Sequence, residues 1–277
     1  MIRSFASCSH ESKPSIERQN INRFGRTRKR ETPEIERIVR TTCCRDGMAG
    51  SSQTGVAGAE ITIRDAETNE LLARGKTVGD SGNDQRIMVE AWPRHAPLRT
   101  ESSAVFRATL ELEEPRQVVV TARGPLSQLQ STAVASVTQW IVPGKHVTGG
   151  DGLTLDLPGF SVDILHPPAR QRVPAGQRQI ELHANVMMMC GCPIEPGGLW
   201  EANAFEVTAL IRQRDRRVAE IALSYAGEIG QFAGSFPIPG PGPYDITVYA
   251  FDPRNGNTGV DRTTVVGAVA ATTADED

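Results

Sequence analysis

The sequence predicts an all-β protein built from two β-sandwich domains. From about residue 53 onward, apolar and polar residues alternate with a period of two, which is the pattern of half-buried strands. The 277 residues include 26 Gly and 18 Pro, a composition suited to many short strands joined by turns. The length suits two domains of roughly 100–120 residues each.

These patterns divide the chain into four segments. We expect a disordered tail over residues 1–52, a first β-sandwich with bridging strands over 53–158, a second β-sandwich over 159–268, and a disordered C-terminal tail over 269–277. The first 47 residues carry a formal charge of +5, with eleven Lys/Arg against six Asp/Glu, although the whole chain carries −3. The two sandwiches are therefore mildly acidic, which argues against nucleic-acid binding.

The N-terminal tail contains a basic run, Arg26–Arg30, that we interpret as solvated charge. Further on, Pro33 and the spacing of Ile35, Ile38 and Val39 allow one or two turns of amphipathic helix in a mostly frayed tail. No apolar stretch is long enough to span a membrane, and no secretory signal is legible before Met48, which is itself a possible alternative start.

The first sandwich is predicted from short alternating runs. Strands are expected at 59–64, 71–74, 104–112 and 117–122, with bridging strands at 134–142 and 153–157. The pattern V-x-G-A-x-I-T-I-x-D-x-x-T-x-x-x-L-A, which starts at Val56, resembles carboxypeptidase-regulatory-like or transthyretin-like β-sandwich modules of bacteria. The resemblance covers about residues 53–124.

Seven further strands are expected at 160–165, 179–188, 205–212, 218–225, 232–236, 244–251 and 262–266. Seven short strands over about 105 residues are typical of an immunoglobulin-like sandwich. The segment from Gly240 to Val266 resembles the last hairpin of bacterial Ig-like domains, and that likeness extends over about residues 160–267. Modules of these two families imply a location outside the cytoplasm, periplasmic or secreted.

The stretch 180–200, IELHANVMMMCGCPIEPGGLW, concentrates the residues with distinctive chemistry. If 179–188 is a strand, His183, Met187 and Met189 share one face and lie beside the loop that holds Cys190 and Cys192. Thiolate, thioether and imidazole ligands together suit Cu(I), and two thiolates with a histidine also suit Zn²⁺. These five residues are the predicted metal ligands.

Two other interpretations of this stretch remain open. Methionine and free cysteine are common in cores, so the stretch is also compatible with soft packing. Alternatively, Cys190 and Cys192 form a redox pair, although a disulfide across C-x-C closes a tight ring and a thiolate pair for a metal is geometrically easier.

A separate oxygen-rich hairpin, from Asp252 to Asp261, is explained more simply by an Asn-Gly turn than by Ca²⁺ binding.

No nucleophile elbow, P-loop or dinucleotide fingerprint occurs in the sequence. We therefore expect a non-enzymatic accessory protein that binds a protein partner, or a second copy of itself, through its sandwich edges, with copper or zinc as the candidate cofactor. One alternative is a thiol- or metal-dependent redox enzyme that uses Cys190 and Cys192. Another is a structural subunit of a surface or filament.

Overall fold

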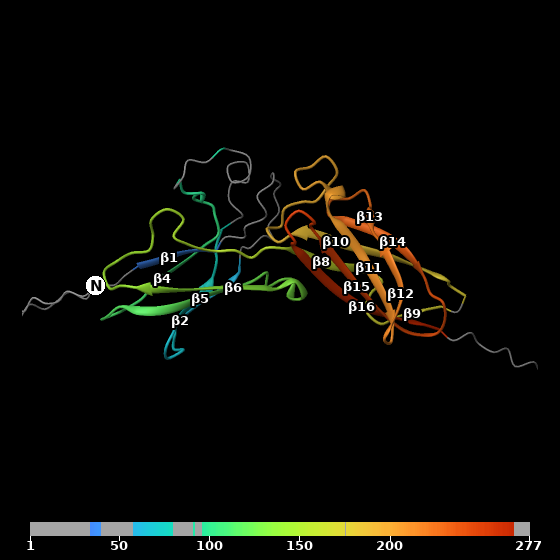
Figure 1. The fold of residues 1–277 in the computed structure, drawn as a ribbon, viewed down its shortest axis with the longest axis horizontal. Coiled ribbons are helices and arrows are strands. Elements are labelled where there is room, and N and C mark those ends of the chain that lie inside the picture. The colour runs from blue at the N-terminus through green and yellow to red at the C-terminus, as the bar shows by residue number, and fades with distance from the viewer. Residues whose placement is uncertain (1–33, 40–57, 80–90, 92–95, 175, 269–277) are drawn as a thin grey trace, which may run out of the picture. The chain divides into compact units, whose positions relative to one another are not determined.

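A computed structural model describes residues 34–39, 58–79, 91, 96–174 and 176–268, the first of these ranges as backbone only (Figure 1). In this part of the chain, sixteen strands and two short 3-10 helices make up the regular structure. The predicted all-β class is thereby confirmed. The predictions for the remaining residues of the two tails lie outside the described residues. No helix among the described residues is long and apolar enough to cross a membrane.

The strands before residue 158 form two sheets around one core. They are β1 (Glu34–Val39), β2 (Glu60–Asp65), β3 (Leu71–Lys76), β4 (Val105–Thr109), β5 (Arg116–Gly124), β6 (Ala133–Ile141) and β7 (Leu153–Leu155). One sheet has the order β3-β2-β5-β6 and the other β4-β1-β7. Ile61 and Ile63 of β2, Val118 and Val120 of β5 and Leu155 of β7 pack in the same core. This is the packing expected of a sandwich.

Strand β1 corrects the expectation of helical turns near Pro33. Residues Glu34–Val39 are extended, and they pair antiparallel with β4 and parallel with β7. This segment therefore occupies the centre of its sheet. Pairing on both sides provides partners for its backbone groups that a short isolated helix lacks.

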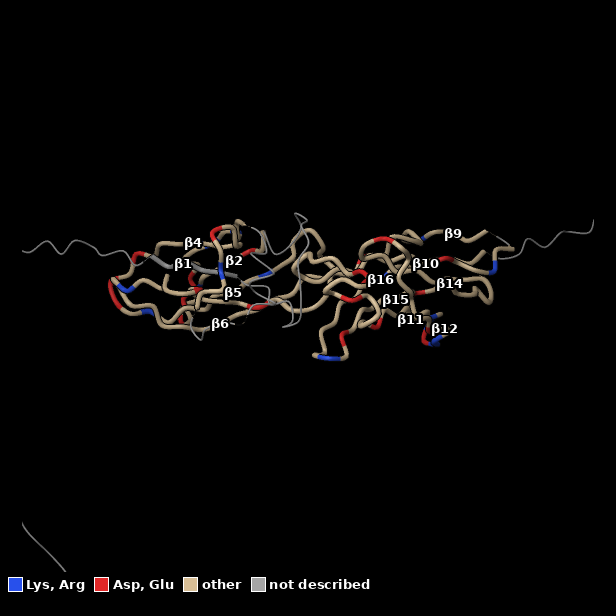
Figure 2. Tube along the Cα trace, turned by 90° about the horizontal axis from the view of Figure 1, so that it is seen from above, with Lys and Arg blue, Asp and Glu red and all other residues tan. Residues whose placement is uncertain are grey.

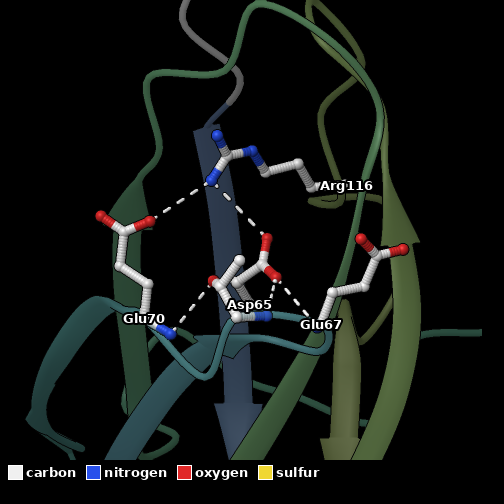
Figure 3. Close-up of polar contacts among 5 residues, drawn as sticks. Asp65, Glu67, Glu70 and Arg116 are labelled. Carbon is white, nitrogen blue, oxygen red and sulfur yellow. Dashed lines mark hydrogen bonds and ion pairs between the residues drawn. The ribbon is translucent and has the colours of Figure 1, made fainter.

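The Asp65 carboxylate organises the turn between β2 and β3 (Figure 3). One carboxylate oxygen accepts hydrogen bonds from the backbone N–H groups of Glu67 and Thr68, both at 2.9 Å. The other oxygen lies 3.6 Å from the Arg116 guanidinium, which is also 3.5 Å from Glu70. The backbone hydrogen bonds from Thr68 and Glu67 lower the pKa of Asp65.

The strands after residue 158 form the second sandwich. They are β8 (Phe160–His166), β9 (Gln171–Val173), β10 (Gln179–Met188), β11 (Glu206–Gln213), β12 (Arg216–Ala222), β13 (Ser224–Tyr225), β14 (Gln231–Pro237), β15 (Gly242–Phe251) and β16 (Thr258–Gly267). One sheet has the order β13-β14-β10-β8, and the other has the order β12-β11-β15-β16-β9. The first is the A-B-E-D sheet of an immunoglobulin-like sandwich, and the second contains its C-F-G strands.

Two details complete this sandwich. Tyr244, fully buried at the start of β15, donates a hydrogen bond to the carbonyl of Gly240 at 2.9 Å and accepts one from its N–H at 3.1 Å. This is the tyrosine corner of immunoglobulin-like domains.

The sequence predicts one strand at 218–225, and the structure has two. The chain changes sheets at the buried Leu223, so that β12 pairs with β11 and β13 pairs with β14.

Candidate functional site

The predicted alternation along β10 is confirmed. Inward side chains from Ile180 to Met188 are buried, whereas Glu181, His183 and Met187 keep solvent exposure on the outer face. The strand pairs with β14 on one side and β8 on the other. Of the predicted metal ligands, His183 and Met187 therefore lie on the outer face of a sheet, four residues apart.

The two cysteines correct the expectation of a thiolate pair. Cys190 and Cys192 are joined by a disulfide, with 5.4 Å between their Cα atoms. The turn that allows it places Gly191 at φ 80°, in the left-handed region that favours glycine, and the Gly191 N–H donates to the Met188 carbonyl at 2.8 Å. Cys190 and Cys192 are only 6% and 4% exposed, and neither sulfur is a free thiolate ligand in this structure.

Met189 is the second departure from the predicted ligand set. It follows the end of β10, is buried, and belongs to the core of the first sandwich together with Leu155 and Leu157. Cys190 and Cys192 belong instead to the core of the second sandwich. In the described ranges, no group of three or more His, Cys, Asp or Glu residues is arranged to hold a metal ion.

The loop that follows the disulfide is packed and internally hydrogen-bonded. Trp200 is buried in the same core cluster as both cysteines, and its carbonyl accepts a hydrogen bond from the Glu195 N–H at 3.1 Å. The Glu201 carboxylate accepts the N–H of Gly197 at 2.7 Å and of Asn203 at 3.0 Å, and these bonds lower its pKa. Among the three interpretations of this stretch, these contacts favour the one in which the methionine and cysteine side chains pack in the core.

The oxygen-rich hairpin between β15 and β16 uses its carboxylate internally. The fully buried Asp252 accepts hydrogen bonds from the Arg254 guanidinium at 2.9 and 3.0 Å and from the Asn255 side-chain amide at 2.8 Å. Burial opposes the ionised form, but the bonds from Arg254 and Asn255 outweigh it, and the pKa of Asp252 is lowered. The predicted turn is confirmed, with Gly256 at φ 79°.

The outer edge of β6, which has no partner strand in the part of the chain that the structure describes, is a feature that the sequence patterns did not single out. Among the described residues, this strand is the last of its sheet, and its nine residues pair with β5 in unbroken register. It contains no charged residue and no proline. Its outward positions include Val134 and Trp140, which are 64% and 57% exposed. A long, regular, uncharged edge offers a row of unpaired backbone groups to another chain.

The other edges in the described part of the chain are each blunted. Strands β7, β9 and β13 have three residues or fewer, and β4 has five. Strands β3 and β12 carry charged side chains and face a shift of register. The β8 edge has a register shift as well, and the Asp261 carboxylate accepts the Ile164 N–H at 2.8 Å. In Figure 2, both charge colours lie beside the label of β12.

Comparison with known proteins adds little to this geometry. No family model matches the chain, and no curated protein matches it. Among solved structures, the chain is similar to fibronectin(III)-like modules of Clostridium thermocellum CbhA, with 11% identity, TM-score 0.28, and coverage of 83% of this chain and 87% of that one. It is also similar to an engineered protein, with 17% identity, TM-score 0.31, and coverage of 47% of this chain and 24% of that one. The fold assignment rests on the strand order.

Proposed function

We propose that this protein is a non-enzymatic accessory protein whose first sandwich binds an extended segment of another polypeptide by adding it to the edge of β6. The observation that carries the proposal is the contrast between β6 and the other edges. Natural sheets blunt their free edges with charge, proline, bulges or short length, and β6 uses none of these devices. An edge left open in this way suits recognition by strand addition.

The side chains of β6 support the same function. In strand addition the backbone supplies affinity, while alternate side chains supply specificity. Trp140 stands directly opposite Gln117 of β5, and Val134 stands opposite Arg123. An exposed tryptophan and valine on one edge strand provide apolar contact area of the kind enriched at interaction surfaces.

The family of the first sandwich and the location of the protein are also part of this proposal. We place the first sandwich among transthyretin-like modules on the sequence pattern that starts at Val56. We place the protein outside the cytoplasm, because disulfides such as Cys190–Cys192 persist in oxidising compartments. A redox enzyme is disfavoured, because thiol exchange requires an accessible sulfur and both cysteines are buried.

The test is binding of extended peptides to the full chain. Peptides enriched from a random displayed library would be labelled and titrated by fluorescence anisotropy against wild type and Ser136→Lys/Thr138→Lys. Both positions are exposed on β6. We expect the two lysines to weaken binding by about tenfold or more, because they convert the edge into a blunted one. Hydrogen exchange should slow at β6 when peptide is bound.

The matched control places the same charge on another edge. Ala222→Lys/Ser224→Lys adds two lysines at exposed positions of β12 and β13, and peptide affinity should stay within about twofold of wild type. Equal loss in both variants would show a nonspecific charge effect, and no enrichment of any peptide would remove the proposal. Self-association that the β6 lysines abolish would identify the occupant as a second copy.

A further inference from the structure

Two histidines face each other on the outer surface of the second sandwich. His166 of β8 and His183 of β10 are direct cross-strand partners. Their rings lie edge to face, with centroids 6.4 Å apart and planes at 78°. The sequence predicts only His183 as a ligand, and the strand that it predicts at 160–165 ends just before His166.

An irregularity in β8 brings His166 to this face. The register pairs Ala184 with Ile164 but the preceding His183 with His166, so that Leu165 is an extra residue in β8. Regular alternation from the buried Phe160 would turn His166 toward the core. One extra residue reverses the side on which the following side chain lies, and such bulges frequently re-aim a side chain at a site.

The surroundings of the pair suit a positive ion. The Glu181 carboxylate lies 3.7 Å from His183 Nε2 and is 80% exposed, so it adds negative charge beside the imidazole. Directly opposed residues have Cβ atoms about 4.5–5.5 Å apart, and imidazole nitrogens bind transition metals at about 2.0–2.1 Å. Rotation of either half-exposed ring therefore brings one nitrogen from each histidine to a shared ion.

We propose that His166 and His183 together bind one divalent transition-metal ion, with Cu²⁺ held most tightly and water completing the coordination. Two imidazoles suit copper, nickel and zinc, and copper is the strongest binder in this series. Four of the five metal ligands predicted from the sequence do not belong to this site. Cys190 and Cys192 are in a disulfide, Met189 is in the other core, and Met187 is four residues along the strand, about 13 Å from His183. The proposal is independent of the β6 edge.

The test uses untagged full-length protein stripped with chelator and titrated with CuCl₂ in the presence of glycine as a competing ligand. We expect one tight equivalent, with an electron paramagnetic resonance spectrum that shows two nitrogen ligands. His166→Asn and His183→Asn should each weaken binding by at least tenfold and leave one nitrogen. His146→Asn removes a histidine outside the pair and should leave the affinity unchanged.

A footprint on the wild-type chain provides a result that does not depend on the variants folding. Bound Cu²⁺ should protect His166 and His183 together from diethyl pyrocarbonate, and not His146. Tight copper binding that survives in the double variant His166→Asn/His183→Asn would overturn the proposal. Protection of only one member of the pair, or the absence of any tight equivalent in wild type, would also overturn it.

Discussion

The two sandwiches differ in the strands that form the edges of their sheets. In the second, β9 and β13 are very short, β12 is charged, and the β8 edge is bonded to Asp261. In the first, β6 runs for nine residues with no charge, proline or break in register. Both are two-layer structures, so the fold class does not account for the difference. Under the proposed function, this contrast leaves the first sandwich open to strand addition at β6 and the second closed to it.

The largest effect is expected from a substitution that destabilises the second sandwich. Asp252→Ala removes a fully buried carboxylate and leaves Arg254 and Asn255 without its hydrogen bonds. Hydrogen bonds to charged groups contribute about 1.5–3 kcal/mol, so we expect unfolding free energy to fall by about 2–3 kcal/mol. Urea unfolding measures the loss. Peptide affinity at β6 should not change in the folded protein, and a parallel loss of affinity would contradict the division of roles.

A smaller effect is expected from opening the edge of β12. Arg217 and Glu220 form an ion pair with 2.6 Å between their nearest atoms, and both side chains are exposed. Arg217→Thr/Glu220→Thr would be made in the Ser136→Lys/Thr138→Lys background, so that any new association reports on β12 alone. We expect a gain of about threefold or less in peptide binding or self-association, because the register shift opposite β12 remains. Sedimentation equilibrium would detect it, and a gain equal to wild-type β6 binding would show that charge alone closes the edge.

The smallest effect is expected on acid titration, where each sandwich has one buried turn carboxylate. The pKa values of Asp65 and Asp252 are both lowered in the folded protein. Their contribution to stability is therefore complete above the ordinary pKa of 3.8 and is lost as the pH falls below it through the folded pKa values. Asp163 acts in the opposite direction, because burial and the nearby Asp261 raise its pKa.

The acid effect would be measured as urea unfolding between pH 2.5 and pH 5 for wild type, Asp65→Asn and Asp252→Asn. Each variant lacks one titrating group and should show a shallower decline of stability below pH 4 than wild type. Peptide affinity in Asp65→Asn should be retained at neutral pH, because β5 lies between the β2–β3 turn and β6 in the sheet. An unchanged slope in both variants would show that other carboxyl groups govern the acid sensitivity.

Much of this structure was predictable from residue alternation, and the failures have physical causes. Strand β10 matched its expected bounds and faces, because its inward positions are uniformly apolar. Strand β1 was missed because its charged sequence carries no such signal and its partners are distant in the chain. The orientation of His166 was missed because one extra residue in β8 reverses the alternation.

The open edge was unpredictable for a different reason. The apolar run 134–142 predicts a strand, which the structure has at Ala133–Ile141, but sequence alone does not reveal the order of strands in a sheet. The same nine residues at the centre of a sheet would offer no unpaired edge.

The cysteine pair was also ambiguous in the sequence. The spacing of Cys190 and Cys192 allowed either a metal or a disulfide, and the turn at Gly191 decided between them.

The parallel pairing of β9 with β16 has a mechanical consequence. β9 lies near the beginning of the second sandwich and β16 is its last strand, and Gln171–Val173 align with Val265–Gly267 in the same direction. Tension applied to the two ends of this domain would load the hydrogen bonds between these strands together, in shear, and would not open them one at a time. A domain tethered at both ends would therefore resist extension at this short pair of strands before its core is exposed.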